Sequence, residues 1–303
     1  MFLELARILL ALVAIVGIGW VLRVSGLVKS EDARPINNII VYVGLPALIF
    51  RAVQPAQLEA ELAGVAAIAW ITFGVVVAIS WYVCKFLGLS SRTSGGFVLA
   101  AALGNTGYIG YPVAQEFLGD TGLVRAIFFD VFGTVMALLI VGLLIAQRKG
   151  ASDNGPVRPL KEILTFPAVI ALMAGLALRW WDIPEPVMDW LGVLSSLVVP
   201  LIMITVGISL RPGTFRRYTI PLTVLLAIRL LLAPLIALVV GPVLLSDYDA
   251  VRLVVLEAGM PSMMLTLVIG ARFKLDTDFI ASAILVTTVG SVITLPLMQL
   301  ALG

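Results

Sequence analysis

Three ionisable residues lie inside long apolar stretches of the sequence: Asp130, Arg229 and Glu257. Each costs about 2.5–3.5 kcal/mol to place at the centre of a membrane helix, so such residues face protein and find partners. A buried carboxylate can carry a proton or bind a coupling ion, which predicts this role for Glu257 and Asp130. The fork of donors on Arg229 can hold a substrate carboxylate. A structural pair of Arg229 with either acid, and an interfacial position for Asp130, are the alternatives.

Polar residues gather where two apolar stretches contain glycine and proline. One stretch reads Gly-Asn-Thr-Gly-Tyr-Ile-Gly-Tyr-Pro over Gly104–Pro112, and the other reads Glu-Ala-Gly-Met-Pro-Ser over Glu257–Ser262. Glycine costs about 1 kcal/mol and proline about 3 kcal/mol inside a helix. Non-helical backbone at membrane depth survives only where protein buries it or water reaches it. Both helices should therefore break around a substrate cavity. For either helix alone, close helix packing through glycine or a simple proline kink is the alternative.

The residues beside these breaks are the candidate substrate ligands. Asn105 is the strongest, because its amide both donates and accepts hydrogen bonds; capping the second half-helix is its structural alternative. Ile49 and Phe50 could form an apolar wall, although most such residues merely face lipid or core. The remaining candidates, which offer hydroxyl groups or mark the breaks, are Thr106, Tyr108, Pro112, Pro261 and Ser262.

The composition places these residues in a membrane protein. Hydrophobic residues make up 61% of the 303 residues and charged residues 13%, whereas soluble domains average about 45–50% and about 25%. The single cysteine, Cys84, and the absence of histidine exclude an internal disulfide, zinc-protease motifs and serine–histidine dyads. There is no GxxxxGK[ST] loop for ATP. We expect no enzyme activity, no metal or cofactor, and no nucleic-acid partner.

Ten stretches are long enough for membrane helices, which need about 20 apolar residues each. They are 5–24, 36–53, 61–84, 94–117, 122–146, 161–180, 187–209, 219–244, 250–271 and 278–301. With ten spans, 14 basic residues fall on one side of the membrane and 5 on the other, and Arg229 lies within a span. The excess of positive charge marks the cytoplasmic side. We therefore expect both termini outside the cytoplasm; an odd span count with one re-entrant segment is the alternative.

The polar linker divides the chain into two five-span halves. We expect a first repeat over residues 1–146, a cytoplasmic linker over 147–160, and a second repeat over 161–303. An odd number of spans in each half inverts the second half, as in inverted-repeat transporters. Spans 4 and 9, the two interrupted ones, then take corresponding positions. The fold expected is all-α, with ten transmembrane helices and broken crossover helices 4 and 9.

Four segments resemble the auxin efflux carrier family, within the group that includes bile acid–sodium symporters. They are Asn38–Phe50, Gly104–Pro112, Glu257–Phe273 and the Leu295–Pro296 pair. The resemblance implies that helices 4 and 9 cross where Pro112 and Pro261 fall. It also implies a scaffold of helices 1, 2, 6 and 7, a mobile transport domain of helices 3–5 and 8–10, and an elevator-type movement.

The function that follows is secondary transport, or facilitated passage, of small organic anions across a membrane. The chain differs from plant members of this family in its short middle loop and in the acids Glu257 and Asp130, where plant members carry neutral residues. These differences favour malate- or malonate-like substrates over auxin-like ones. The expected coupling ion is H⁺ or Na⁺, the expected location is a bacterial inner membrane, and a homodimer suits the scaffold. A channel, or a membrane sensor or receptor with the same fold, is the alternative function.

Overall fold

The computed structural model describes residues 14–151, 158–209 and 215–302, and no β-strand occurs among them. The start of the first expected span, the middle of the expected linker and part of the loop between the seventh and eighth expected spans lie outside the described residues. The chain divides into two compact units. One comprises Met1–Leu58 and Ile163–Leu210, and the other comprises Glu59–Glu162 and Arg211–Gly303. The first unit thus contains the residues of expected spans 1, 2, 6 and 7.

The first unit is built from short helices. An apolar helix over Ala14–Val24 precedes the others. These are η1 Ser30–Asp32, α2 Ala33–Ile39, the π-helical η2 Ile40–Gly44, α3 Leu45–Val53, α9 Pro167–Ala177, α10 Glu185–Ser196 and α11 Val198–Ser209. Within this unit α3 packs against α9 and α10, and α11 packs against α2. The side-chain amide of Gln54 donates to the carbonyls of Leu178 and Trp181, at 3.3 and 2.9 Å, and so fixes the end of α3.

The expected sixth span is bent. Its two helices, α8 Pro159–Thr165 and α9, meet at 62° around Phe166. Phe166 is extended, with φ −78° and ψ 120°. Proline at the next position, Pro167, disfavours the helical conformation for the residue before it. The sequence therefore dictates the bend.

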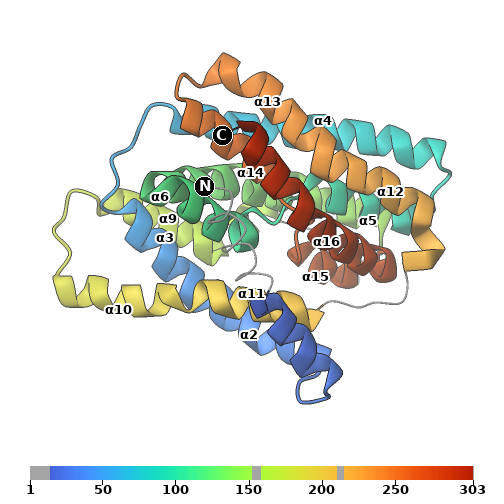
Figure 1. Cartoon of the computed structure of the whole chain (residues 1–303), viewed down its shortest axis with the longest axis horizontal. Helices are drawn as coiled ribbons and strands as arrows, with labels where there is room; N and C mark the ends of the chain where they lie inside the picture. Colours follow the sequence, from blue (N-terminus) through green and yellow to red (C-terminus); the bar gives the residue numbers. More distant parts are fainter. Residues whose placement is uncertain (1–13, 152–157, 210–214, 303) are drawn as a thin grey trace. The chain divides into compact units, whose positions relative to one another are not determined.

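The second unit holds the remaining helices. They are α4 Leu62–Phe86, α5 Ser91–Ala102, η3 Thr106–Gly110, α6 Tyr111–Phe128, η4 Phe129–Val135, η5 Leu138–Gly142, α7 Leu143–Lys149, η6 Phe215–Tyr218, α12 Thr219–Ala227, η7 Ile228–Leu232, α13 Ala233–Leu244, α14 Tyr248–Ala258, α15 Leu265–Arg272 and α16 Thr277–Leu302. In this unit α13 packs along both α4 and α14, and α4 also packs on α5 and η4 (Figure 1).

The described residues contain six helices that are long and apolar enough to cross a membrane, or seven if the bent pair forms one span. The fourth and fifth expected spans share one apolar helical stretch, Thr106–Lys149, after the break that follows α5. Gly119 interrupts this stretch with φ 65° and ψ −158°. This conformation is open to glycine and strained for other residues. The connection between the expected spans 94–117 and 122–146 is therefore a sharp kink between two helical segments. The count of ten spans and the inverted repeat stay predictions.

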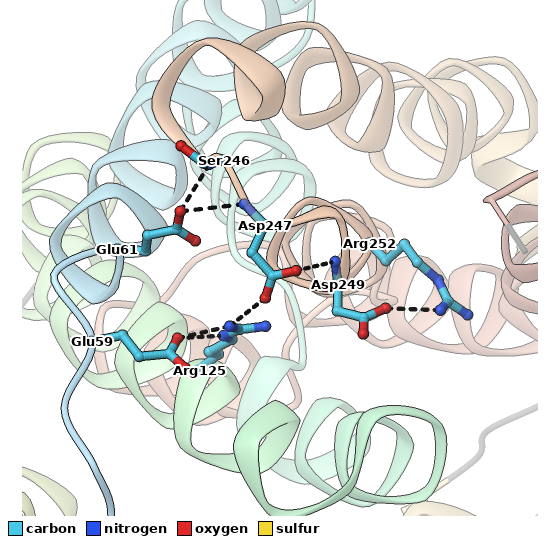
Figure 2. Close-up of polar contacts among 7 residues, drawn as sticks. All are labelled: Glu59, Glu61, Arg125, Ser246, Asp247, Asp249 and Arg252. Carbon is cyan, nitrogen blue, oxygen red and sulfur yellow. Dashed lines mark hydrogen bonds and ion pairs between the residues drawn. The ribbon is translucent and has the colours of Figure 1, made fainter.

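A polar cluster in the second unit ties three helices together at one end (Figure 2). The guanidinium of Arg125, on α6 beyond the kink, donates to Glu59 at 2.7 Å and pairs with Asp247 at 2.5 Å. Glu61, just before α4, accepts the backbone N–H groups of Ser246 and Asp247, at 2.9 and 3.2 Å. The loops before α4 and before α14 are thereby joined to α6. The two loops and this part of α6 belong to the side of the membrane that the distribution of basic residues assigns to the exterior.

A second cluster gathers loops assigned to the opposite side. Asp276 accepts hydrogen bonds from the hydroxyls of Thr93, at 2.9 Å, and Tyr218, at 3.1 Å. It also accepts the backbone N–H of Phe279, in the first turn of α16, at 3.1 Å. The Tyr218 hydroxyl lies outside the apolar spans, and its pKa is raised by burial and by the neighbouring Asp276 carboxylate. These contacts group the loops as the alternation of spans predicts.

Candidate substrate site at the helix crossover

Two broken helices meet in the second unit. Helix α5 ends at Ala102, Leu103 is extended, and η3 begins at Thr106. Helix α14 ends at Ala258, and α15 begins only at Leu265. Both interruptions expected from the sequence are therefore present.

Backbone pairing joins the two breaks. Gly104 and Ser262 form an isolated antiparallel β-bridge. The N–H of Asn105 donates to the Pro261 carbonyl at 2.7 Å, and the N–H of Met263 donates to the Leu103 carbonyl at 2.9 Å. Each break thus satisfies backbone groups that the other leaves without a helical partner.

The expected position of Pro112 at the crossing is wrong. The backbone break falls at Leu103–Asn105, while Pro112 lies in the first turn of α6, directly after the π-helical η3. Proline has no N–H to donate within a helix, and here it follows a π-helical turn in which the helix hydrogen bonds are already irregular. Pro261 does lie at the crossing, through its carbonyl.

Three glycines, spaced three residues apart, each face one buried ionisable side chain. A β-carbon placed on Gly104 would lie 3.1 Å from Arg229 Nη2, and one on Gly107 would lie 3.0 Å from Asp130 Oδ2. A β-carbon on Gly110 would overlap both carboxylate oxygens of Glu257. Because these glycines have no side chains, Arg229, Asp130 and Glu257 can reach the backbone of the broken helix.

Arg229, on η7, binds the carboxyl ends of both broken helices. It is 2% exposed. Nη1 donates to the carbonyls of Ala101 and Ala102, each at 3.2 Å, and Nη2 donates to the Ala258 carbonyl. Helix carboxyl ends expose carbonyls and carry partial negative charge, so a cation stabilises them. Among the described residues, Arg229 forms no ion pair with Glu257 or Asp130 within 4.0 Å. A role for Arg229 in binding substrate stays a prediction.

Asp130 lies in the π-helical η4 and is buried, with 5% exposure. Its carboxylate accepts hydrogen bonds from the hydroxyls of Thr106, at 2.5 Å, and Tyr111, at 2.7 Å. Tyr111 was not among the sequence candidates, yet Gly107 lies four residues before it and faces the same carboxylate. Tyr111 lies within the Gly104–Pro112 stretch, and this position was the available signal. Tyr108 is half-buried.

Glu257 differs from the other two ionisable residues because its carboxylate has no partner. It is 0% exposed, and both oxygens lack a hydrogen bond within the described part of the chain. An isolated buried charge is costly, so such a group is protonated or binds a cation. The chemistry of this position thus suits the binding of a coupling ion.

The remaining candidate substrate ligands lie in both units and differ in their contacts. Asn105 directly precedes η3 and is 3% exposed, but its side chain makes no capping hydrogen bond. The Ser262 hydroxyl donates to the Ala100 carbonyl at 2.7 Å. Ile49 and Phe50 lie on α3 in the first unit, where Ile49 is buried and Phe50 half-buried. Their role as an apolar wall stays a prediction.

Comparison with known proteins places the chain among transporters. A model of a family described as membrane transport proteins, of auxin efflux carrier type, matches residues 6–299. An uncharacterized transporter of Methanothermobacter thermautotrophicus is 34% identical over 99% of both chains. Another, from Methanocaldococcus jannaschii, is 29% identical over 96% of both chains.

A more distant relative carries a substrate in its name. A protein of Rhizobium meliloti named "Putative malonate transporter" is 26% identical over 86% of this chain and 83% of its own length. Buried charges, paired helix breaks and apolar helices all suit an integral membrane protein whose relatives are named as transporters. The chain belongs to the membrane transport protein family of auxin efflux carrier type.

Proposed function

We propose that this protein is a secondary transporter or facilitator of small organic anions, with malonate- or malate-like carboxylates as substrates. The observation that carries the proposal is the crossover itself. Two helices break at contacting positions, and three buried ionisable side chains converge on the broken backbone. Breaks of this kind mark substrate and ion sites in secondary transporters. The name of the Rhizobium meliloti relative supports the substrate class.

Glu257 is the proposed site of coupling to H⁺ or Na⁺, with Asp130 as its helper. Glu257 suits this role because its oxygens have no protein partner among the described residues. Asp130 already accepts hydrogen bonds from two hydroxyl groups, so less of its carboxylate is left to bind an ion. Substrate binding is proposed for the candidates around the crossover: Asn105, Thr106, Tyr108, Arg229, Pro261 and Ser262.

The proposed mechanism is an elevator-type movement of the second unit as a transport domain. Its support is the division of the chain, since the crossover and all three buried charges belong to the one unit. The first unit would then provide the scaffold, with a homodimer as one assembly, in a bacterial inner membrane. Ligand-gated current without accumulation of solute would instead identify a channel.

Uptake of radiolabelled malonate into proteoliposomes tests the proposal. We expect an imposed pH or sodium gradient to drive accumulation in the wild type. The Asn105→Ala, Glu257→Ala double variant should lose at least tenfold in rate. Glu116→Gln is the matched control, because Glu116 is an exposed acid on α6. Undiminished transport by the double variant would remove the site assignment, and no uptake of any carboxylate by the wild type would remove the function.

A further inference from the structure

The chain passes between the two units at three places: after Leu58, after Glu162 and after Leu210. The third place adjoins residues outside the described structure. At the second, Glu162 forms an exposed pair with Arg272 of the second unit at 3.1 Å, and exposed pairs contribute little to stability. The first crossing, from α3 to α4, is held by buried side chains in each unit.

In the first unit, this crossing is anchored at Gln54, the residue that follows α3. Gln54 is 7% exposed, and its side-chain amide donates to two carbonyls just beyond α9. The N–H of Ala56 then donates to the Val53 carbonyl at 3.2 Å, so the chain turns directly after the anchor. Gln57 and Leu58 make no hydrogen bond with any described residue. The chain is therefore fixed at Gln54 and free for a few residues beyond it.

In the second unit, Glu59 and Glu61 anchor the other end of the crossing (Figure 2). One oxygen of Glu59 accepts two N–H groups from the buried guanidinium of Arg125, at 2.7 and 3.2 Å. Arg125 also pairs with Asp247, so it would keep a partner without Glu59. Glu61 accepts two backbone N–H groups, those of Ser246 and Asp247. Glu59 is thus the first anchor after the crossing, and Glu61 is the second.

The spacing of the anchors fixes how far apart the two ends can lie. Only residues 55–58 separate Gln54 from Glu59. A fully extended chain spans at most about 3.6 Å per residue, so the α-carbons of Gln54 and Glu59 can separate by no more than about 18 Å. If Glu59 is released, the next anchor is Glu61, and the reach grows by two residues, or about 7 Å.

We propose that the segment Gln54–Glu59 is a tether of fixed reach that limits the travel of the second unit relative to the first, and that the Arg125–Glu59 pair sets its length. The inference rests on the proposed movement of the second unit. It gives a role to a buried arginine outside the crossover: Arg125 is a positioning residue that acts through Glu59. The tether would stop the second unit at a defined distance without any contact to the substrate.

A deletion with two possible rescues tests the tether. Deleting Ala56 and Gln57 shortens the reach by about 7 Å, and we expect malonate uptake into proteoliposomes to fall about tenfold, because the movement is restricted. Adding Glu59→Ala moves the anchor to Glu61 and returns two residues, so uptake should recover to within about twofold of the wild type. Adding Glu61→Ala instead is the matched control. It also removes two hydrogen bonds from the cluster but leaves Glu59 as the anchor, so uptake should stay low. Equal uptake by the two rescue variants, in protein that still unfolds cooperatively, would overturn the tether.

A distance measurement tests the tether without the deletion and without transport. Spin labels at Asp189→Cys on α10 and Asp120→Cys on α6, both exposed positions, are introduced in a Cys84→Ala background. Pulsed EPR then reports the separations that the two units sample. Glu59→Ala should extend the distance distribution by up to about 7 Å, whereas Glu61→Ala should leave it as in the wild type. Equal distributions in these two variants would overturn the tether while transport stands. If the distributions differ as expected but the wild type transports no carboxylate, the tether stands and the proposed function falls.

Discussion

At the scale of single residues, the site depends on small residues as much as on charged ones. Arg229, Asp130 and Glu257 each lie against a glycine of the Gly104–Gly110 segment. The charged groups are thereby brought onto the backbone of a broken helix, where carbonyls and N–H groups are available. The same glycines that weaken the helix also create the space for the charges, so one sequence feature serves both purposes.

The Glu257 contact makes Gly110→Ala a substitution that acts directly on the candidate site. Its β-carbon would overlap both oxygens of the Glu257 carboxylate, and overpacking of this kind costs about 1–3 kcal/mol. We expect a lower unfolding temperature in detergent and at least a tenfold loss of transport. Gly74→Ala on α4 is the control, because nothing lies within 4 Å of its β-carbon. There alanine should be neutral or stabilise the helix by up to about 1 kcal/mol. Equal behaviour of the two variants would contradict the proposed contact.

Tyr111→Phe isolates the hydroxyl that sequence reasoning overlooked. It removes one of the two donors to the buried Asp130 carboxylate. Because hydrogen bonds to charged groups contribute about 1.5–3 kcal/mol, we expect a destabilisation of that order in thermal unfolding. Tyr108→Phe should change stability by less than about 0.5 kcal/mol, since no hydrogen bond of its hydroxyl is found in the described structure. A larger effect of Tyr108→Phe than of Tyr111→Phe would reverse the assignment.

At the scale of the elements, the crossover is a pair of helix breaks that complete each other. Two backbone hydrogen bonds join them, and Arg229 binds carbonyls from both carboxyl ends. The existence of both breaks could be predicted, because glycine and proline weaken helices by known amounts. The break position could not, because glycine, asparagine and proline residues are spread over the nine residues from Gly104 to Pro112. Only pairing with Ser262 selects Gly104, and this contact depends on tertiary structure.

Other elements show the same difference between local and tertiary signals. The bend at Phe166 has a local cause, because Pro167 directly follows it. Glu59, by contrast, is one of two acids in the loop before α4, and nothing in its neighbours distinguishes it from a solvated side chain. Its pairing with Arg125 becomes visible only when α6 is placed against this loop. Buried charges were predictable because apolar surroundings make them conspicuous, whereas an anchoring acid in a loop is not conspicuous.

The stability supplied by the polar cluster that joins α4, α6 and α14 should depend on pH. Burial acts to raise the pKa of Asp247, but the N–H of Asp249 and the Arg125 guanidinium outweigh it and hold the pKa below its ordinary value of 3.8. A carboxyl with a lowered pKa in the folded state stabilises the fold above its unfolded pKa, and this stabilisation is lost as the pH falls through the folded pKa. We expect the unfolding temperature of the wild type to drop below about pH 4.

Asp247→Asn should lower the unfolding temperature at neutral pH and weaken this acid response. The loss should be modest, because the Asp247 side chain is 42% exposed and solvent screens the pair. Asp249→Asn serves as the control, since it keeps the backbone N–H that binds Asp247 and changes only the exposed carboxylate that pairs with Arg252, three residues along α14. If both variants keep the acid response of the wild type, Asp247 does not link these helices.

At the scale of the whole molecule, the topology in the membrane is the main prediction still open. Six helices of the described chain qualify as spans by length and composition, and the others are divided by kinks and breaks. A count by helix length would miss spans in a protein whose membrane-crossing helices contain breaks. The distribution of basic residues is independent of helix length, and it favours ten spans with both termini outside the cytoplasm.

Cysteine labelling tests that topology directly. The only native cysteine, the buried Cys84, is replaced in a Cys84→Ala background, and one cysteine is then introduced at an exposed position of each loop. A membrane-impermeant maleimide on intact cells should label Asp182→Cys and Ser246→Cys, and label Ser25→Cys and Ser91→Cys at least tenfold more slowly; inside-out vesicles should reverse the order. Because every span inverts the chain, labelling of Ser91 and Ser246 from the same side would require an odd number of crossings to be added or removed between α5 and α14. The crossover breaks would then no longer lie in oppositely inserted halves, and the inverted repeat would be excluded.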